Sequence, residues 1–296
     1  MTSSAQFNRE IVVRFAPSPN GLLHLGHAYA AILAHDYARE RGARFLLRIE
    51  DIDTARSKPE FVDAIFADLL WLGLDWDGEV IFQSDRFDDY AVAVERLKRR
   101  GLLYPCFCSR SEIRVAQEKH GKKQGADGPI YPGTCRNIDA SGAAARMKME
   151  AHSWRLDVDK AHAITGQLQW HDEQLGLQLA DPSSLGDVVL VPKDTPVSYH
   201  LAVTVDDARD AVTDVVRGMD LFASTHIHRL LQGLLDLPTP KYVHHGLLLD
   251  ETGSKLAKSR ASSSLSQLRK AGENGKRLAE KLRNSILPVG NSLLEG

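Results

Sequence analysis

The feature that most constrains this chain is a strand, a proline-rich turn, a helix and a second strand within its first fifty residues. Residues 11–15 (IVVRF) are β-branched or aromatic around one arginine, which is typical of a short buried strand. The sequence PSPNG at 17–21 forms a turn, because proline fixes φ and Asn-Gly tolerates positive φ. A helix rich in alanine and leucine is expected over 25–41 and another strand over 45–49. Such a unit predicts a parallel sheet covered by helices.

The composition is that of a globular chain that folds around its own core. Of 296 residues, 43% are hydrophobic and 26% are charged, which excludes a disordered or collagen-like chain. No apolar run approaches the ~20 residues that span a bilayer, and the first ten residues contain no apolar segment of a signal peptide. We therefore expect a cytoplasmic protein without membrane contact, and a monomer.

Periodicity predicts further elements along the chain. Amphipathic helices are expected first, then a strand-rich region, a helix, a strand and two closing helices. Their expected ranges are 59–71 and 87–100, then 153–205, 219–235, 241–249, and finally 262–271 and 276–287.

Basic residues gather in two segments although the net charge is only −2. Residues 96–136 hold ten Lys or Arg against three Asp or Glu, and residues 253–296 hold nine against three. The segments are either solvated helix faces or a localised contact with a polyanion.

Two histidines, His24 and His27, follow the turn at the expected start of the first helix. Their spacing places both imidazoles on one helix face, and Gly26 between them lets a ligand approach the backbone. The amino end of a helix attracts phosphate, and imidazoles there can donate hydrogen bonds to charge that develops in nucleotidyl transfer. A His-x-x-His pair alone is common on surfaces, so the prediction of a nucleotide site rests on the strand, turn and helix around it.

A segment with two lysines, Lys255 and Lys258, occupies 253–260 (GSKLAKSR). Lysine is a mobile point charge suited to phosphate, and the flanking glycine and serines favour a loop that can close over a ligand. Lysines at this spacing are also common on solvated loops. Together with the histidine motif they predict a contact with a triphosphate, for which Lys258 is the better candidate.

All three cysteines fall within 30 residues, at Cys106, Cys108 and Cys135. Their odd number disfavours a disulfide framework. Three thiolates suit a soft metal, and tetrahedral Zn²⁺ takes a fourth ligand, for which His120 and Tyr131 are candidates. The alternative is three small buried hydrophobic residues.

These motifs resemble those of a known family. RFAPSPNG followed by HLGH is similar to the signature of the class I aminoacyl-tRNA synthetases of the glutamyl group, whose second element is the HIGH motif. KLAKS at 255–259 resembles the KMSKS loop of that class, with Ala257 in place of the usual serine. The resemblance covers nearly the whole chain, but only the catalytic half of a full glutamyl-tRNA synthetase.

The resemblance implies roles for individual residues. The two histidines would stabilise the α-phosphate of ATP in the transition state, and Lys258 would hold the β- and γ-phosphates together with Mg²⁺. Glutamate brings two carboxylates, which arginine binds in a fork, and an ammonium, which a carboxylate can hold. The implied catalytic residues are His24, His27 and Lys258, with Gly26 and Lys255 as further ATP contacts. The implied glutamate contacts are Arg14, Phe15, Ala16, Pro17, Ser18, Glu50, Tyr199 and Arg217.

The cysteine pattern carries its own resemblance. Cys-x-Cys followed by Tyr-x-x-x-Cys looks like the zinc site of the glutamyl-Q branch of this family. It implies one structural Zn²⁺ held by the three cysteines, with Tyr131 rather than His120 as the fourth ligand.

The chain has 36 residues after Arg260, which leaves room for one or two short helices but not for an anticodon-binding domain. This combination is similar to the glutamyl-Q tRNA(Asp) synthetase family. It implies that glutamate is activated by ATP without tRNA and then transferred to queuosine in the anticodon loop of tRNA(Asp). The alternatives are a shortened glutamyl-tRNA synthetase that charges the 3′ end of tRNA(Glu), a catalytically silent tRNA-binding paralogue, or another adenylate-forming nucleotidyltransferase.

The expected fold is α/β: a Rossmann-like class I aminoacyl-tRNA synthetase catalytic domain with a zinc-containing insertion and a short helical C-terminus. The expected parts are a nucleotide-binding core over 8–100 and 186–250, the insertion over 101–185, and the lysine loop with the closing helices over 251–290.

Overall fold

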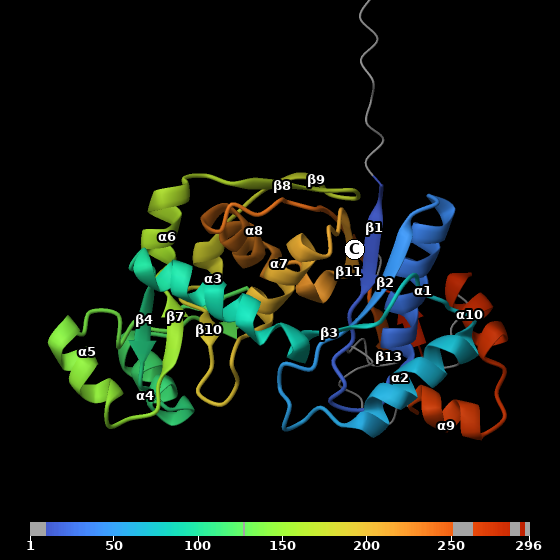
Figure 1. Ribbon diagram of the computed structural model, residues 1–296, viewed down its shortest axis with the longest axis horizontal. Coiled ribbons are helices and arrows are strands. Elements are labelled where there is room, and N and C mark those ends of the chain that lie inside the picture. Colours follow the sequence, from blue (N-terminus) through green and yellow to red (C-terminus); the bar gives the residue numbers. More distant parts are fainter. Residues whose placement is uncertain (1–9, 127, 251–262, 285–290, 294–296) are drawn as a thin grey trace, which may run out of the picture.

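The centre of the molecule is a parallel sheet with strands from both halves of the chain (Figure 1). The computed structural model describes residues 10–126, 128–250, 263–284 and 291–293. Strands β1, β2 and β3 pair in parallel in that order, as do β11 and β12. The backbone N–H of Thr213, which precedes β11, donates to the carbonyl of Val12 at 2.9 Å and joins the two sets. These strands are β1 (Val12–Phe15), β2 (Arg44–Ile49), β3 (Ile81–Phe82), β11 (Asp214–Gly218) and β12 (Lys241–His245).

A hairpin extends the sheet beyond β12. Strand β8 (Gln169–Asp172) pairs in parallel with β12, and β9 (Gly176–Leu179) pairs antiparallel with β8. The resulting strand order is β3-β2-β1-β11-β12-β8-β9. Strands β2 and β3 extend the sheet on one side of β1, whereas β11 and β12 extend it on the other side, so the order reverses between β1 and β11. In open α/β sheets, ligands bind outside the carboxyl ends of the strands at such a point.

Side-chain alternation separates the core from the polar face of the sheet. Val13 and Phe15 of β1 lie in one buried cluster with helix α1 (Leu25–Glu40), whereas Val12 belongs to a cluster on the other face. Successive residues of a strand point to opposite faces. Arg14 therefore lies on the face away from α1, although it is only 5% exposed.

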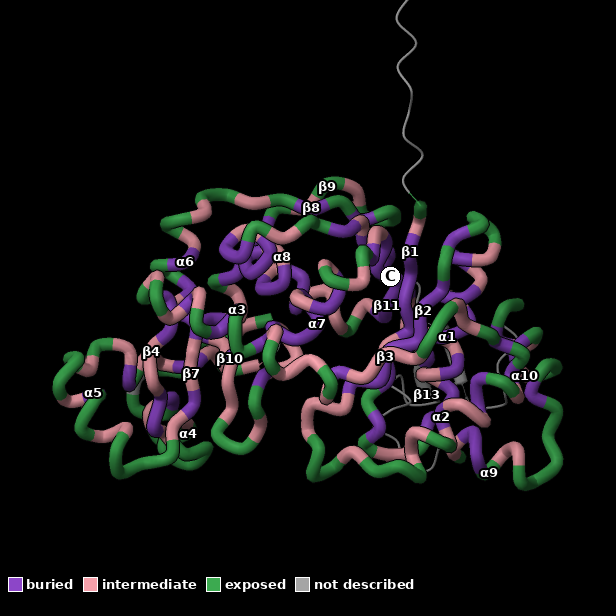
Figure 2. The backbone as a smooth tube through the Cα atoms, viewed as in Figure 1, coloured by how far each residue is buried: buried purple, intermediate pink, exposed green. Residues whose placement is uncertain are grey.

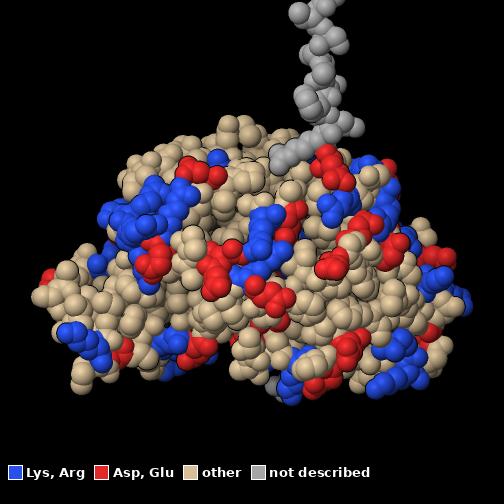
Figure 3. All heavy atoms as spheres, viewed as in Figure 1, with Lys and Arg blue, Asp and Glu red and all other residues tan. Residues whose placement is uncertain are grey.

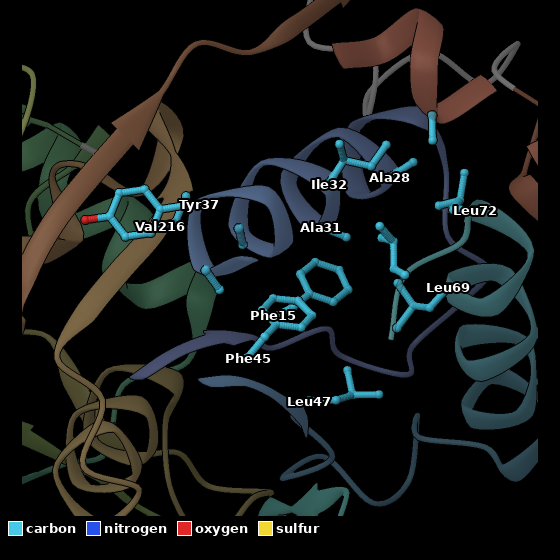
Figure 4. Close-up of a cluster of buried hydrophobic side chains, with 14 of the residues drawn as sticks. Phe15, Ala28, Ala31, Ile32, Tyr37, Phe45, Leu47, Leu69, Leu72 and Val216 are labelled. Atoms are coloured by element: carbon cyan, nitrogen blue, oxygen red, sulfur yellow. The ribbon is translucent and has the colours of Figure 1, made fainter. Parts of the chain in front are cut away.

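Helix α1 packs on β1 and β2 through small and branched side chains, which Figure 4 shows above Phe15, Phe45 and Leu47. Its buried positions include Ala28, Ala31 and Ile32. Three more helices complete this layer, and α10 contacts both α1 and α2. They are α2 (Pro59–Leu72), α9 (Leu265–Lys270) and α10 (Gly275–Arg283).

A second lobe is built on a three-stranded antiparallel sheet in the order β10-β7-β4. A separate apolar cluster fills the space between this sheet and helices α3, α6, α7 and α8, while α4 and α5 lie at the outer end (Figures 1 and 2). The strands are β4 (Leu103–Cys106), β7 (Ser153–Leu156) and β10 (Val189–Val191), with a two-residue pair β5 (Gln124–Gly125) and β6 (Gly128–Pro129). The helices are α3 (Phe87–Arg99), α4 (Arg110–His120), α5 (Ala140–Met147), α6 (Val158–Thr165), α7 (Tyr199–Arg209) and α8 (Ser224–Leu234).

The expected α/β fold is confirmed, with differences in detail. The helices predicted over 25–41, 59–71 and 87–100 match α1, α2 and α3 within two residues. The region 153–205 is not purely strand-rich, because it contains α6 and α7. The strand predicted over 241–249 is two strands, β12 and β13 (Leu248–Asp250), and the latter pairs with β14 (Asn291–Leu293).

Strand pairing crosses the expected domain boundaries. Strand β10 lies within 186–250 but pairs with β7 of the insertion, and β8 lies within 101–185 but pairs with β12 of the central sheet. Each expected part therefore contributes a strand to the sheet of the other: β10 to the sheet of the insertion, and β8 to the central sheet. Within the described residues, no helix is both long and apolar enough to cross a lipid bilayer.

Two aspartates on α7, and Asp210 at its carboxyl-terminal cap, form ion pairs with arginines on the polar face of the sheet. Asp207 accepts two hydrogen bonds from Arg14, at 2.9 and 3.3 Å, and one from Arg48 at 2.8 Å. Arg48 also donates to Asp210 at 3.2 Å, and its side chain is fully buried. Asp206 accepts from Arg86 at 2.9 Å. One helix is thereby held to β1, β2 and the start of α3 by charge-assisted hydrogen bonds.

Replacing Asp207 with alanine should lower the free energy of unfolding by ~3–5 kcal/mol, because it leaves two buried guanidinium groups without their shared counter-charge. Urea denaturation followed by circular dichroism measures this loss. The exposed Asp194→Ala is the matched control and should leave the midpoint nearly unchanged. An equal, small effect of both variants would contradict a structural role for the network.

Candidate active site

A cavity of about 700 Å³ opens at the carboxyl ends of β1 and β11. It lies where the order of the parallel strands reverses, the position at which such sheets bind ligands. Every described residue that the sequence predicted for ATP or glutamate binding contributes to its wall. These residues are Arg14, Phe15, Ala16, Pro17, Ser18, His24, Gly26, His27, Glu50, Tyr199 and Arg217.

The His24 and His27 rings are in contact at the amino end of α1, with their planes tilted against each other. Their ring centroids are 3.8 Å apart, with 39° between the planes. His24 is the N-cap: its Nδ1 accepts from the N–H of Gly26 at 3.1 Å, and Nδ1 of His27 accepts from the N–H of His24 at 3.2 Å. A Cβ on residue 26 would lie only 3.0 Å from the His24 ring, so a side chain there would require the ring to shift by a few tenths of an ångström. The histidines thus occupy the roles that serine and glutamate have in a capping box.

These hydrogen bonds fix the tautomer of both imidazoles. Burial lowers the pKa of His24 and lowers the pKa of His27 to about 3, with the nearby His24 adding to the second shift. Both rings are therefore neutral near pH 7. Because each Nδ1 accepts a backbone N–H, each proton sits on Nε2. The pair has two Nε2–H donors available for phosphate oxygens at a helix amino terminus.

Glu50 supplies a buried carboxylate to the cavity wall. Its backbone N–H donates to the carbonyl of Pro17 at 3.0 Å, which ties the end of β2 to the proline turn. Its carboxylate lies 3.7 Å from the Arg48 guanidinium. Burial nevertheless raises the pKa of Glu50 to about 7. Desolvation therefore outweighs the attraction of the nearby arginines, and a substrate ammonium would restore the ionised form.

Arg217 is a buried cation held by neutral partners. It donates to Nε2 of His244 at 3.1 Å, to Nδ1 of His228 at 3.3 Å and to Oγ1 of Thr225 at 2.6 Å. Its Nη1 also lies 3.5 Å from the Tyr199 hydroxyl. No carboxylate among the described residues lies within 4 Å of its guanidinium, unlike that of Arg14. Its charge is therefore free to pair with a ligand carboxylate.

The cavity contains residues that the sequence reasoning missed. Tyr29, Asp220 and His245 line it, together with the connection from β12 to β13. His245 donates from Nδ1 to the carbonyl of Gly246 at 2.8 Å, and its buried Nε2 has no hydrogen-bond partner among the described residues. For two of them the available signal was position: Asp220 follows β11 and His245 ends β12, at the carboxyl ends where parallel strands present ligand contacts. Tyr29 lies on α1, two residues after His27.

Lys255 and Lys258 lie outside the described residues. Of two described residues near this segment, one lines the cavity and the other is hydrogen-bonded to a residue that lines it. Leu248, at the start of β13, lines it, and the N–H of Leu265, at the start of α9, donates to the carbonyl of Leu23 at 2.8 Å, one residue before His24.

The three cysteines converge as expected. Their sulfur atoms all lie within 4.8 Å of one another, and Sγ of Cys108 is 3.5 Å from Sγ of Cys135. The Tyr131 hydroxyl is 3.4 Å from Sγ of Cys106 and accepts from the N–H of Cys135 at 3.0 Å. Such a set of three sulfurs and one oxygen suits a tetrahedral soft metal. The cluster could therefore bind a metal ion; the side chain of His120 lies outside the described part of the molecule.

The chain resembles synthetases in sequence and in fold. Residues 10–292 match the family of class I tRNA synthetases (E and Q), catalytic domain. A glutamyl-Q tRNA(Asp) synthetase from Rhodobacter capsulatus is 48% identical over 88% of this chain and 96% of the relative. Another, from Symbiobacterium thermophilum, is 43% identical over 88% of this chain and 81% of the relative.

A solved structure shows the same fold. The crystal structure of a glutamate tRNA ligase from Elizabethkingia meningosepticum in complex with its amino acid superposes with a TM-score of 0.69 at 26% identity. The match covers 89% of this chain and 53% of the ligase, so the chain spans about half the length of that protein.

Proposed function

The chain belongs to the class I tRNA synthetases of the glutamyl and glutaminyl group, and on that basis we propose that it activates L-glutamate with ATP and transfers it to queuosine in tRNA(Asp). The observation that carries the proposal is one cavity whose wall presents two Nε2–H donors, two arginines and one buried carboxylate. Those groups match the charges of a nucleotide and of glutamate. The choice of acceptor rests on the named activity of the relatives.

The first step needs no protein nucleophile. A glutamate α-carboxylate oxygen attacks the α-phosphorus of ATP, and the bond to the leaving pyrophosphate breaks. Positioning and charge stabilisation carry this step. His24 and His27 donate from Nε2 to the α-phosphate oxygens, where negative charge accumulates. Lys258 neutralises the β- and γ-phosphates, and ATP enters with Mg²⁺.

Glutamate is held by the arginines and Glu50. The ammonium pairs with the Glu50 carboxylate, whose nearest described cation is 3.7 Å away. Arg217 and Tyr199 receive a substrate carboxylate, because the guanidinium lacks a direct counter-charge and the Tyr199 hydroxyl, which accepts from Arg217, keeps its proton to donate. In the second step, a hydroxyl of the RNA attacks the acyl carbon and AMP leaves.

The RNA partner is supported by the surface charge. Lys and Arg side chains gather at the carboxyl end of α3 (Figure 3), whose last turn holds Arg96, Lys98 and Arg99 within the basic segment that the sequence indicated. Arg96 and Lys98 pair with the exposed carboxylates of Asp236 and Glu95. Exposed pairs of this kind are weak and screened by salt, so they leave the patch able to contact phosphates.

The proposed function is tested by pyrophosphate exchange with glutamate and with glutamine, with and without tRNA. We expect exchange with glutamate alone. Labelled glutamate should then appear on queuosine-containing tRNA(Asp) and not on the terminus of tRNA(Glu). Label on the 3′ end of tRNA(Glu) only would establish the shortened glutamyl-tRNA synthetase instead, and no exchange under any condition would favour a silent paralogue.

Replacing His27 with asparagine should lower the rate of pyrophosphate exchange by ~10²–10³, because it removes one Nε2–H donor. Its amide oxygen can still accept from the His24 N–H, as Nδ1 of His27 does now at 3.2 Å. His27→Ala should show the same loss of rate with an additional loss of stability from the missing cap. Retention of exchange in either variant would refute the assigned role.

The KM for glutamate should fall as pH rises from 6 to 8. Glu50 has a pKa of about 7 in the free protein, raised by burial. Below that pH it is protonated and cannot attract the substrate ammonium, so KM should rise up to roughly tenfold per pH unit. Glu50→Gln should have a high KM that is independent of pH in this window. A wild-type KM that does not change across the window would contradict the assignment.

We propose that the cysteine cluster holds one structural Zn²⁺, with Tyr131 as the fourth ligand. Burial raises the pKa of Cys108 to about 11, so a cation is needed to stabilise its thiolate. Elemental analysis should find about one zinc per chain, and Cys135→Ser should lose it. Tyr131→Phe should release zinc to a chelator faster than the wild type, whereas His120→Ala should not. The reverse order of these two variants would make His120 the ligand.

A further inference from the structure

We propose that Asp172 and His244 are positioning residues for Arg217, a role that rests on the proposed function of Arg217 as a glutamate-binding residue. His244 lies between the two: its Nδ1 is 2.6 Å from Oδ2 of Asp172, and its Nε2 accepts from Nε of Arg217 at 3.1 Å. Both Asp172 and His244 are almost fully buried, at 0% and 1% exposure. Neither side chain belongs to the wall of the cavity.

The sheet register brings these side chains together. Arg217 of β11 and His244 of β12 are direct neighbours in the parallel pairing, and Asp172 of β8 pairs with Tyr242, two residues before His244. Val216 and Val243 face α1, so the residues that follow them, Arg217 and His244, face the opposite side. Three adjacent strands thus align an acid, an imidazole and a guanidinium in one row.

The direction of each hydrogen bond follows from the chemistry of arginine. A guanidinium can only donate, so Nε2 of His244 must be the unprotonated nitrogen. The ring proton is then on Nδ1 and is donated to Asp172. Burial lowers the pKa of His244 to about 4, with Arg217 contributing, so the ring stays neutral near pH 7 despite the adjacent carboxylate. Asp172 therefore selects the tautomer that presents a lone pair to Arg217, as the aspartate of a Ser-His-Asp triad does for its histidine.

Asp172 is itself fixed by the turn of the hairpin. Its other oxygen, Oδ1, accepts from the backbone N–H groups of Gln174 and Leu175 at 3.0 and 3.1 Å. The turn between β8 and β9 thus determines where the carboxylate lies. The carboxylate in turn orients the His244 ring, and the ring orients Arg217.

The remaining contacts of Arg217 show why its orientation needs this support. Nη1 donates toward His228 and Tyr199, and Nη2 donates to Thr225. Among the described residues, one N–H of Nη2 has no acceptor and can donate to a ligand. The guanidinium of Arg217 is planar. If it rotates, its free N–H and the adjacent Tyr199 hydroxyl no longer point together at a substrate carboxylate. Nε is the atom that sets this rotation, and His244 holds it.

The test is Asp172→Asn, which changes the tautomer while retaining the size of the side chain. The amide oxygen must keep accepting from the turn N–H groups, so the amide nitrogen faces His244 and donates to Nδ1. The ring proton then moves to Nε2 of His244. Two donors, this N–H and the Nε–H of Arg217, face each other, and their hydrogen bond is lost. We expect the KM for glutamate to rise ~10- to 100-fold, because a hydrogen bond to a charged group is lost. The kcat and the KM for ATP should change little.

Two variants of His244 separate positioning from packing. In His244→Gln the amide oxygen can still accept from Arg217, and the KM for glutamate should stay within about threefold of the wild type. In His244→Asn the shorter side chain can still reach Asp172 but not Arg217, and the KM should match that of Asp172→Asn. Equal KM values for Gln and Asn variants would overturn the proposal.

Glu173→Gln is the matched control, because it removes the same charge from the same hairpin. Glu173 pairs with Arg41 and Lys241 on the surface and has no contact with His244 or Arg217. It should leave the KM for glutamate unchanged. Nitrogen-15 NMR of the His244 ring should show a proton on Nδ1 in the wild type and on Nε2 in Asp172→Asn. The same tautomer in both proteins would refute the mechanism.

The two proposals fail in different ways. If the wild-type protein shows no glutamate-dependent pyrophosphate exchange, the proposed function is wrong. If it shows exchange but Asp172→Asn has a wild-type KM for glutamate, only the positioning role is wrong.

Discussion

The carboxylate of Asp207 between Arg14 and Arg48 is the interaction on which the rest of the site depends. It connects α7 to β1 and β2 at once, with donor distances of 2.8 to 3.3 Å. Removing charges from water is costly, and the cost is recovered only when each charge has partners in good geometry. Because Glu50 comes directly after β2, two residues beyond Arg48 and 3.7 Å from its guanidinium, this network also sets the position of the ammonium-binding carboxylate. Tyr199 begins the same helix that carries Asp207, so the opposite wall of the cavity is set by it too.

The two arginines of the cavity have different electrostatic surroundings, and this difference gives the cavity its selectivity for charge. Arg14 is neutralised by Asp207, whereas Arg217 donates to neutral acceptors, one of which, His244, separates it from the carboxylate of Asp172. Burial also keeps the histidines neutral, and their Nδ1 atoms are occupied by backbone N–H groups. Among the described residues of the cavity wall, Arg217 is therefore the arginine whose positive charge has no direct counter-charge.

The apolar periodicity and the turn residues of the sequence predicted the elements whose structure depends mainly on neighbouring residues. The strand, turn and helix of 11–41 carry their own apolar period and stop signals, and the structure agrees closely. Helix α7 was missed because its buried face carries aspartates. In a sequence, aspartates indicate a solvent-exposed face, so they interrupt the apolar periodicity of a buried helix. The convergence of the cysteines was predictable from spacing, but the exchange of β8 and β10 between lobes was not, because it depends on pairing between distant strands. The roles of Asp172 and His244 likewise required the register of three strands.

The same strands carry both core residues and site residues, because successive side chains of a strand point to opposite faces of the sheet. In β1 and β2 the odd-numbered Val13, Phe15, Phe45 and Leu47 pack under α1, and the even-numbered Arg14 and Arg48 face α7. In β11 and β12 the residue that packs toward α1 is Val216 or Val243, and the next residue in each strand, Arg217 or His244, faces the opposite side. A shift of one residue in either pairing would bury a guanidinium under α1 and expose a core side chain. The hydrophobic requirement of the core therefore enforces the register that aligns Arg14, Arg217 and His244, so selection for a stable sheet also preserves the geometry of the site.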